Sequence, residues 1–347
     1  MYQKAKNKKI FIIAEAGVNH NGDIRMARRM VDAARDAGAD AVKFQTFVAK
    51  ALVTSKAPQA AYQRKNAQDV SQQSMLKKLE LPFPAFRELA AYCRKRRIMF
   101  LSTPFDSTSA RFLFELAVPF FKISSGDLNN VPFLTEIARY RRPIILSTGM
   151  STLKEVGTSV RAILKAGNRR LTLLQCTTDY PSDYSDVNLR AMATLSQAFG
   201  LPVGLSDHTP GIEIAVAAAA LGAVVIEKHF TLDKSLPGPD HLASLDPVEL
   251  SALVNSVRHV EAAMGDGKKS PCRAELGVMA VARKSLVAAR DIPVGTLLGP
   301  EDVVIKRPGT GIAPGLLDSV VGHRARRAIA ADTLISWKDI AQRERRR

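Results

Sequence analysis

The sequence predicts an α/β fold, a (β/α)8 TIM barrel followed by a small, mostly-β C-terminal domain. Eight short apolar runs between residues 10 and 230 alternate with helical patterns. The runs are continuously apolar, as in parallel strands that are buried on both faces. A cluster of polar, glycine or ionisable residues ends each run, at the place where the active sites of such barrels lie.

The eight strand ends can be followed in order along the chain. They lie at 15–20, 43–46, 102–105, 122–127, 147–150, 176–178, 206–209 and 227–230. Between them, Asp23 is placed to cap a helix that ends at Gly38, and Thr152 to cap one that ends at Gly167. One interval, 48–84, is longer than the others, and we expect it to be a functional lid or binding loop.

The composition changes after a predicted helix at 247–264, where a polar Gly/Pro segment follows. We therefore expect a barrel domain over 1–266, a linker over 267–280 and a second domain over 281–347. Short β-type runs at 285–289 and 303–305, separated by turns, indicate that the second domain is mostly β. At roughly 65 residues it is near the lower limit for independent folding, so we expect it to pack against another surface.

Composition restricts the class of protein. The 347 residues are 46% hydrophobic and 24% charged, which is typical of a globular protein, with a net charge of +17. The dense basic runs at 94–97 and 343–347 read as solvated surface rather than a nucleic-acid site, and the positive field favours a small anionic substrate. Three cysteines without metal-ligand spacing and no apolar stretch of ~20 residues predict a cytoplasmic protein with no membrane segment.

Two histidines follow the last two predicted strands. His208 and His229 should lie on neighbouring strands at the same face of the barrel. Two imidazoles with water and substrate oxygens suit a divalent cation, and Asp207 and Glu227 are placed to orient them. A structural role for each histidine is the alternative.

Two lysines end apolar strands, where an unpaired charge would be unfavourable. Lys43 and Lys122 either form salt bridges to Glu15 or Asp127 or bind an anionic substrate. Hydroxyl groups at the same face favour the second interpretation, a site for phosphate and carboxylate together; they belong to Thr103, Ser125, Ser147 and Ser206.

Six motifs in order resemble those of the sialic acid synthases, the family of N-acetylneuraminate synthase and related bacterial enzymes. They are EAGVNHNG at 15–22, VKFQT at 42–46, STPFD at 102–106, LSDHT at 205–209, EKHF at 227–230 and GPDH at 238–241. The segment KRPGTG at 306–311 resembles the antifreeze-like (SAF) domain that follows the barrel in this family.

The resemblance implies condensation of phosphoenolpyruvate with an N-acylated mannosamine-type sugar and water. The products would be a nine-carbon 2-keto sugar acid and phosphate, released by C–O cleavage with the help of Mn²⁺, Mg²⁺ or Co²⁺. The expected first acceptor is N-acetylmannosamine; its 6-phosphate and a 2,4-diacetamido-2,4,6-trideoxy hexose, the substrate of a legionaminate-type synthase, are alternatives.

The resemblance also implies roles for individual residues. The catalytic set is Glu15, Lys43, Lys122, Asp127 and Arg307, and His208 and His229 bind the metal. The substrate-binding set is Gln45, Thr103, Phe105, Ser125, Ser147, Thr178, Tyr180, Ser206 and Asp240. Asp127 stands where many members have Glu, and Thr178 where some have Asn. Arg307 matches an arginine delivered by the partner subunit, which implies a domain-swapped homodimer.

Two other functions remain open at this point. A barrel aldolase or lyase would use Lys122 or Lys228 to form a Schiff base with a keto acid. A carbohydrate- or nucleic-acid-binding protein would use the basic surface without catalysis. Release of phosphate from phosphoenolpyruvate would exclude the second of these.

Overall fold

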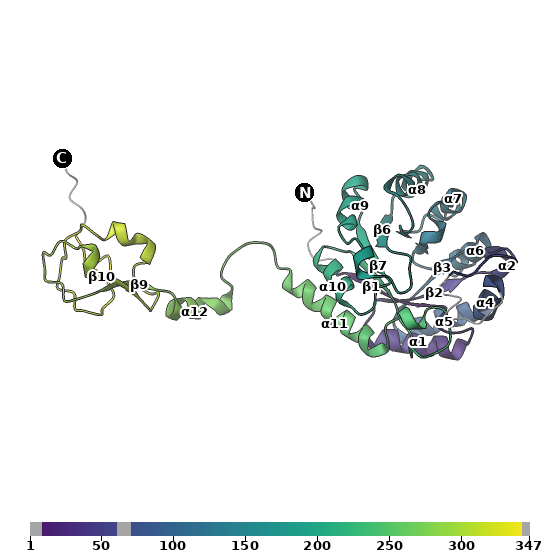
Figure 1. Ribbon diagram of the computed structural model, residues 1–347, viewed down its shortest axis with the longest axis horizontal. Coiled ribbons are helices and arrows are strands. Elements are labelled where there is room, and N and C mark those ends of the chain that lie inside the picture. The colour runs from purple at the N-terminus through teal and green to yellow at the C-terminus, as the bar shows by residue number, and fades with distance from the viewer. Residues whose placement is uncertain (1–8, 61–70, 342–347) are drawn as a thin grey trace. The chain divides into compact units, whose positions relative to one another are not determined.

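The computed structural model describes residues 9–60 and 71–341. They fall into two compact units, Met1–Gly265 and Asp266–Arg347, whose placement relative to one another is not determined (Figure 1). None of the described helices combines the length and the apolar character that a membrane crossing requires.

The first unit contains the eight predicted parallel strands. They are β1 (Phe11–Gly17), β2 (Ala41–Thr46), β3 (Met99–Pro104), β4 (Phe121–Ile123), β5 (Ile144–Ser147), β6 (Leu171–Cys176), β7 (Val203–Asp207) and β8 (Val225–His229). Hydrogen bonds connect them in the order β3-β2-β1-β8-β7-β6-β5-β4, and β3 also contacts β4. The predicted TIM-barrel fold is confirmed.

Helices lie around these strands (Figure 1). They are α1 (Ile24–Asp36), α2 (Ala49–Leu52), α4 (Gln72–Leu79), α5 (Phe83–Arg96), α6 (Ser107–Glu115), α7 (Val131–Arg139), α8 (Leu153–Lys165), α9 (Ala191–Phe199), α10 (Glu213–Ala220) and α11 (Pro247–Ala263). The predicted caps are present, since Asp23 accepts a hydrogen bond from the Arg25 amide and Thr152 forms a capping box with Glu155.

The barrel interior is built in two layers. A lower layer is apolar and consists of Ile13, Ala41, Leu101, Ile145, Leu174 and Val225. Alternate residues of a strand point to the same side, so the residue two positions later enters the next layer up. These later residues are Glu15, Lys43, Thr103, Ser147, Cys176 and Glu227, all of them buried. The strands therefore place a charged and polar layer directly above an apolar one.

The long interval 48–84 contains α2, α4 and the start of α5. A small apolar cluster lies beneath it, formed by Val18, Phe47, Ala49, Met75 and Leu79, with Phe105 packed against it. Residues 61–70 lie outside the described part of the chain, so its role as a lid or binding loop remains a prediction. The basic run at 343–347 also lies outside the described part of the chain.

The second unit has its own apolar core. Strands β9 (Ser285–Ala288) and β10 (Val303–Lys306) pair antiparallel over a cluster that includes Leu286, Ile292, Ile312 and Ile335. Within the segment predicted as linker, helix α12 (Arg273–Ala282) begins where Glu275 accepts a hydrogen bond from the Cys272 amide. The domain boundaries themselves remain predictions.

Two buried histidines should make the barrel unit sensitive to acid. Burial lowers the pKa of His20 and that of His241 to about 4. Because both values lie below the ordinary histidine pKa of about 6.5, their contribution to stability is complete above pH 6.5 and is lost as the pH falls towards 4. For His20 alone, this loss is about 3 kcal/mol.

The replacement His20→Asn tests this expectation, because an amide oxygen can take the place of Nδ1, which accepts from the Gly22 amide. The free energy of unfolding, measured with urea between pH 7.5 and 4.5, should fall less steeply than in the parent protein. His259→Asn, at an exposed position of α11, is the control and should leave the slope unchanged. An equal slope in His20→Asn and the parent would contradict the assignment.

Candidate active site

A network of buried charges lies at the carboxyl ends of β1, β2, β4 and β8. Lys43 Nζ is 2.8 Å from Glu15 Oε2 and 3.6 Å from Glu227 Oε2, and it donates to Thr103 Oγ1 at 3.0 Å. Lys122 Nζ is 3.3 Å from Glu227 Oε1. Glu227 thus lies between the two lysines, and the anchoring of Lys122 comes from Glu227 rather than Asp127.

The two carboxylates in this network differ in protonation. Burial raises the pKa of Glu15 to about 7, because Lys43 offsets the effect only in part. Burial also acts to raise the pKa of Glu227, but Lys122 and Lys43 together hold it well below its usual range. Glu227 is therefore ionised at neutral pH, while Glu15 is partly protonated. Burial also lowers the pKa of Lys122, an effect that Glu227 offsets in part.

Hydroxyl groups surround the lysines. Ser206 Oγ donates to Glu227 Oε1 at 2.9 Å. Ser147 Oγ is buried and has no hydrogen-bond partner among the described residues. Ser125 Oγ accepts from the Gly149 amide at 3.0 Å, and a Cβ on Gly149 would come within 2.2 Å of Thr178 Oγ1. A side chain at position 149 would therefore collide with the hydroxyl groups of the predicted residues Ser125 and Thr178.

The two histidines meet as predicted at the ends of β7 and β8. Their ring centroids are 5.4 Å apart, and Tyr180 lies 4.3 Å from the His208 ring and 5.6 Å from the His229 ring. His229 Nδ1 is 3.9 Å from Asp240 Oδ2. This corner of the barrel mouth therefore combines two imidazoles, a phenol and a buried carboxyl group.

The ring nitrogens fit a divalent metal. His208 Nδ1 donates to the Thr177 carbonyl oxygen at 2.6 Å, which in the neutral ring leaves the lone pair on Nε2. Burial acts to lower the pKa of His208, but Cys176 and the Thr177 carbonyl oxygen outweigh it and raise that pKa, so a bound metal would have to displace a proton there. His229 Nδ1 is buried without a hydrogen-bond partner in the described structure, and burial holds the pKa of His229 well below its usual range. The described residues form no group of three or more His, Cys, Asp or Glu that could hold a metal ion, so the fit rests on the two imidazoles alone.

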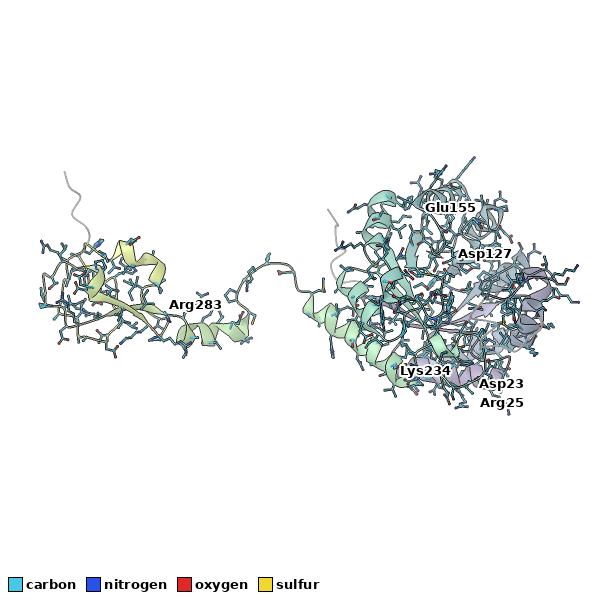
Figure 2. The ribbon with its side chains drawn as sticks, in the orientation of Figure 1. Asp23, Arg25, Asp127, Glu155, Lys234 and Arg283 are labelled. Carbon is cyan, nitrogen blue, oxygen red and sulfur yellow. The ribbon has the colours of Figure 1, made fainter. Side chains whose placement is uncertain are left out.

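Of the remaining predicted residues, some contact the charged network and others do not. Gln45 Nε2 donates to Glu15 Oε1 at 3.4 Å, and Phe105 packs edge-on against Phe47. The Asp127 carboxylate accepts from Ser124 and Asn130 in the turn after β4 and is labelled on the barrel unit in Figure 2. Arg307 is exposed in the second unit, directly after β10. The structure thus neither joins these last two to the charged network nor excludes them from the site.

Sequence reasoning did not include Glu227 and Cys176 among the site residues. Glu227 was expected only to orient a histidine, yet it forms an ion pair with each of the two lysines. Cys176 Sγ is 3.4 Å from Ser125 Oγ and 3.9 Å from His208 Nδ1. The signal was available, because both residues occupy strand positions two after an apolar inward residue, Val225 and Leu174.

An eight-stranded barrel with buried lysines, carboxylates and histidines at the carboxyl ends of its strands has the architecture of a TIM-barrel enzyme. Residues 30–269 match the model of the NeuB family and residues 283–341 that of the SAF domain. The chain belongs to the NeuB family, and the predicted membership in the sialic acid synthases is confirmed.

Relatives match over nearly the whole chain. N,N'-diacetyllegionaminic acid synthase of Campylobacter jejuni is 48% identical over 94% of this chain and 99% of its own. The enzyme of the same name from Legionella pneumophila is 48% identical over 95% of this chain and 94% of its own. Among solved structures, N-acetylneuraminic acid synthetase from Leptospira borgpetersenii has a TM-score of 0.69 and 35% identity over 78% of this chain and 90% of its own.

Proposed function

We propose that this enzyme is a legionaminate-type synthase. It condenses phosphoenolpyruvate with 2,4-diacetamido-2,4,6-trideoxymannose and water, giving a nine-carbon 2-keto sugar acid and phosphate. The observation that carries the choice of acceptor is the 48% identity, over nearly full length, to two enzymes named N,N'-diacetyllegionaminic acid synthase. The alternative acceptor from the sequence thereby replaces N-acetylmannosamine as the main proposal.

The lysine pair accounts for binding of phosphoenolpyruvate. Lys43 and Lys122 are buried, and Glu227 holds both in place before the substrate arrives. Two buried lysines beside one fully ionised carboxylate suit a substrate that carries both a phosphate and a carboxylate. The Ser147 hydroxyl, which has no hydrogen-bond partner among the described residues, offers a further hydrogen bond to one of these anions.

Groups of this chain are suited to two of the steps of the proposed reaction. The C3 carbon of phosphoenolpyruvate forms the new bond to the aldehyde carbon of the sugar, water adds to C2, and phosphate leaves by C–O cleavage. Glu15, whose pKa is near 7, is suited to accept the proton of that water. A divalent cation held by His208 and His229 would polarise the aldehyde.

The proposal includes a domain-swapped homodimer. Arg307 would reach the sugar site of a partner subunit in a domain-swapped homodimer, and the enzyme would act in the cytoplasm. The exposure of Arg307 within its own unit is compatible with this, because the guanidinium is available to bind elsewhere.

An acceptor comparison tests the proposed substrate. Phosphate release from phosphoenolpyruvate should be fastest with the 2,4-diacetamido-2,4,6-trideoxy sugar, slower with N-acetylmannosamine and slowest with its 6-phosphate. The trideoxy sugar and N-acetylmannosamine differ at C4, acetamido against hydroxyl, and at C6, methyl against hydroxymethyl, and differences of this size give about 10- to 100-fold discrimination in kcat/KM. A higher kcat/KM with N-acetylmannosamine would reverse the assignment, and borohydride trapping of a substrate on Lys122 would indicate the aldolase instead.

A further inference from the structure

A second buried ion pair lies beside the charged network but outside it. Lys228 Nζ is 2.7 Å from Asp207 Oδ2, and both side chains are 1% exposed. Asp207 and Lys228 are neighbours in the register of β7 and β8. Each follows a residue that points into the barrel, Ser206 and Glu227, so the pair lies on the outer, helix-covered side of the same strands.

The ion pair forms hydrogen bonds with the chain on either side of His208. Lys228 Nζ also donates to the Thr209 carbonyl oxygen. The amide and the hydroxyl of Thr209 both donate to Asp207 Oδ1, at 2.9 and 2.8 Å. The residues on either side of His208 are thus tied to each other and to Lys228, which immediately precedes His229 in the chain.

The contacts of Lys228 connect the backbone segments that precede the two imidazoles, on the outer side of the barrel. The register that pairs Asp207 with Lys228 brings His208 next to His229 one residue later. His208 lies just beyond the end of β7, where strand hydrogen bonds no longer fix the chain. The His208 carbonyl oxygen accepts a hydrogen bond from the Ser182 amide at 2.9 Å, and the contacts of Lys228 with Asp207 and Thr209 hold the residues on either side of His208.

Stability alone is a poor explanation for such a pair. Taking two charges out of water costs several kcal/mol per ion, and apolar replacement of a buried pair is often neutral or stabilising. Residues behind metal ligands, in contrast, commonly control ligand orientation, and their loss weakens metal binding by about 10- to 100-fold.

We propose that Lys228 and Asp207 are positioning residues that fix His208 relative to His229 and so set the affinity of the site for a divalent cation. This inference rests on the proposed function, because it requires that the two imidazoles bind the metal. The pair does not touch the substrate in this proposal and acts only through the backbone of residues 207–209.

The test measures Mn²⁺ binding to the full-length apoprotein by electron paramagnetic resonance, without substrate. Lys228→Met and Asp207→Asn should each raise the Kd by about 10- to 100-fold. The double variant Asp207→Asn/Lys228→Met leaves no unpaired buried charge, so it should regain thermal stability, yet its Kd should remain raised. Lys234→Met, which removes the ion pair with Glu249 in the loop after β8, is the matched control.

The outcomes distinguish failure of the positioning role from failure of the metal site itself. If the parent protein binds Mn²⁺, His208→Ala abolishes binding and the double variant binds as the parent does, the pair is only structural and the inference is overturned. If either single variant fails to fold, the double variant still decides. If the parent protein does not bind Mn²⁺, or His208→Ala binds it unchanged, the proposed metal site fails and the inference fails with it.

Discussion

Exhaustive removal of divalent cations should abolish phosphate release from phosphoenolpyruvate in the presence of the acceptor sugar. Polarisation of a carbonyl by a metal contributes several kcal/mol, so we expect a loss of at least about 1,000-fold in kcat. Activity should return when Mn²⁺ is added back. His208→Ala and His229→Ala should show the same loss with an unchanged circular dichroism spectrum.

The matched control for these variants is His259→Ala, because His259 is exposed on α11 and far in sequence from both strand ends. It should keep full activity and the same response to chelation. Full turnover after exhaustive chelation, with residual metal measured by mass spectrometry, would remove the metal from the proposed reaction.

Replacement of Arg307 should lower catalysis sharply while leaving the barrel site intact. Loss of a charge-assisted contact from a desolvated site amounts to roughly 2–3 kcal/mol, or one to two orders of magnitude in kcat/KM. Arg307→Ala should therefore bind Mn²⁺ as the parent protein does but react slowly. Arg326→Ala, at another exposed arginine of the second unit, is the control and should react normally.

Mixing two inactive variants tests where Arg307 acts. In a domain-swapped dimer, a mixed dimer of Arg307→Ala with Lys122→Ala contains one site that has both residues. Activity should therefore return when the two proteins are unfolded, mixed and refolded together. No recovery, although native mass spectrometry shows that mixed dimers have formed, would exclude the swapped arrangement.

The fold could be predicted from the sequence because its signals are local. A buried parallel strand must be apolar along its length, and helix ends need caps such as Asp23 and Thr152, so each element is visible in a few consecutive residues. The meeting of His208 and His229 followed from the same reasoning, since neighbouring parallel strands end at one face.

The pairing inside the site could not be predicted with the same success. Whether Lys122 meets Asp127 or Glu227 depends on which residues share a layer across the barrel, and Glu227 lies more than 100 positions away in sequence. The helical turn that contains Asp127 turns its carboxylate towards Ser124 and Asn130 instead. Helix α12 was missed because the Gly/Pro segment just before it dominated the composition.

The two-layer interior limits how this protein can diverge. Each residue of the apolar layer is separated by one position from its charged or polar successor, as in Ile13 and Glu15 or Val225 and Glu227. Insertion or deletion of a single residue within a strand would exchange inward for outward side chains and bury the wrong set. Changes in loop length are therefore tolerated more easily than changes in strand length, both in evolution and in the design of specificity for a new acceptor sugar.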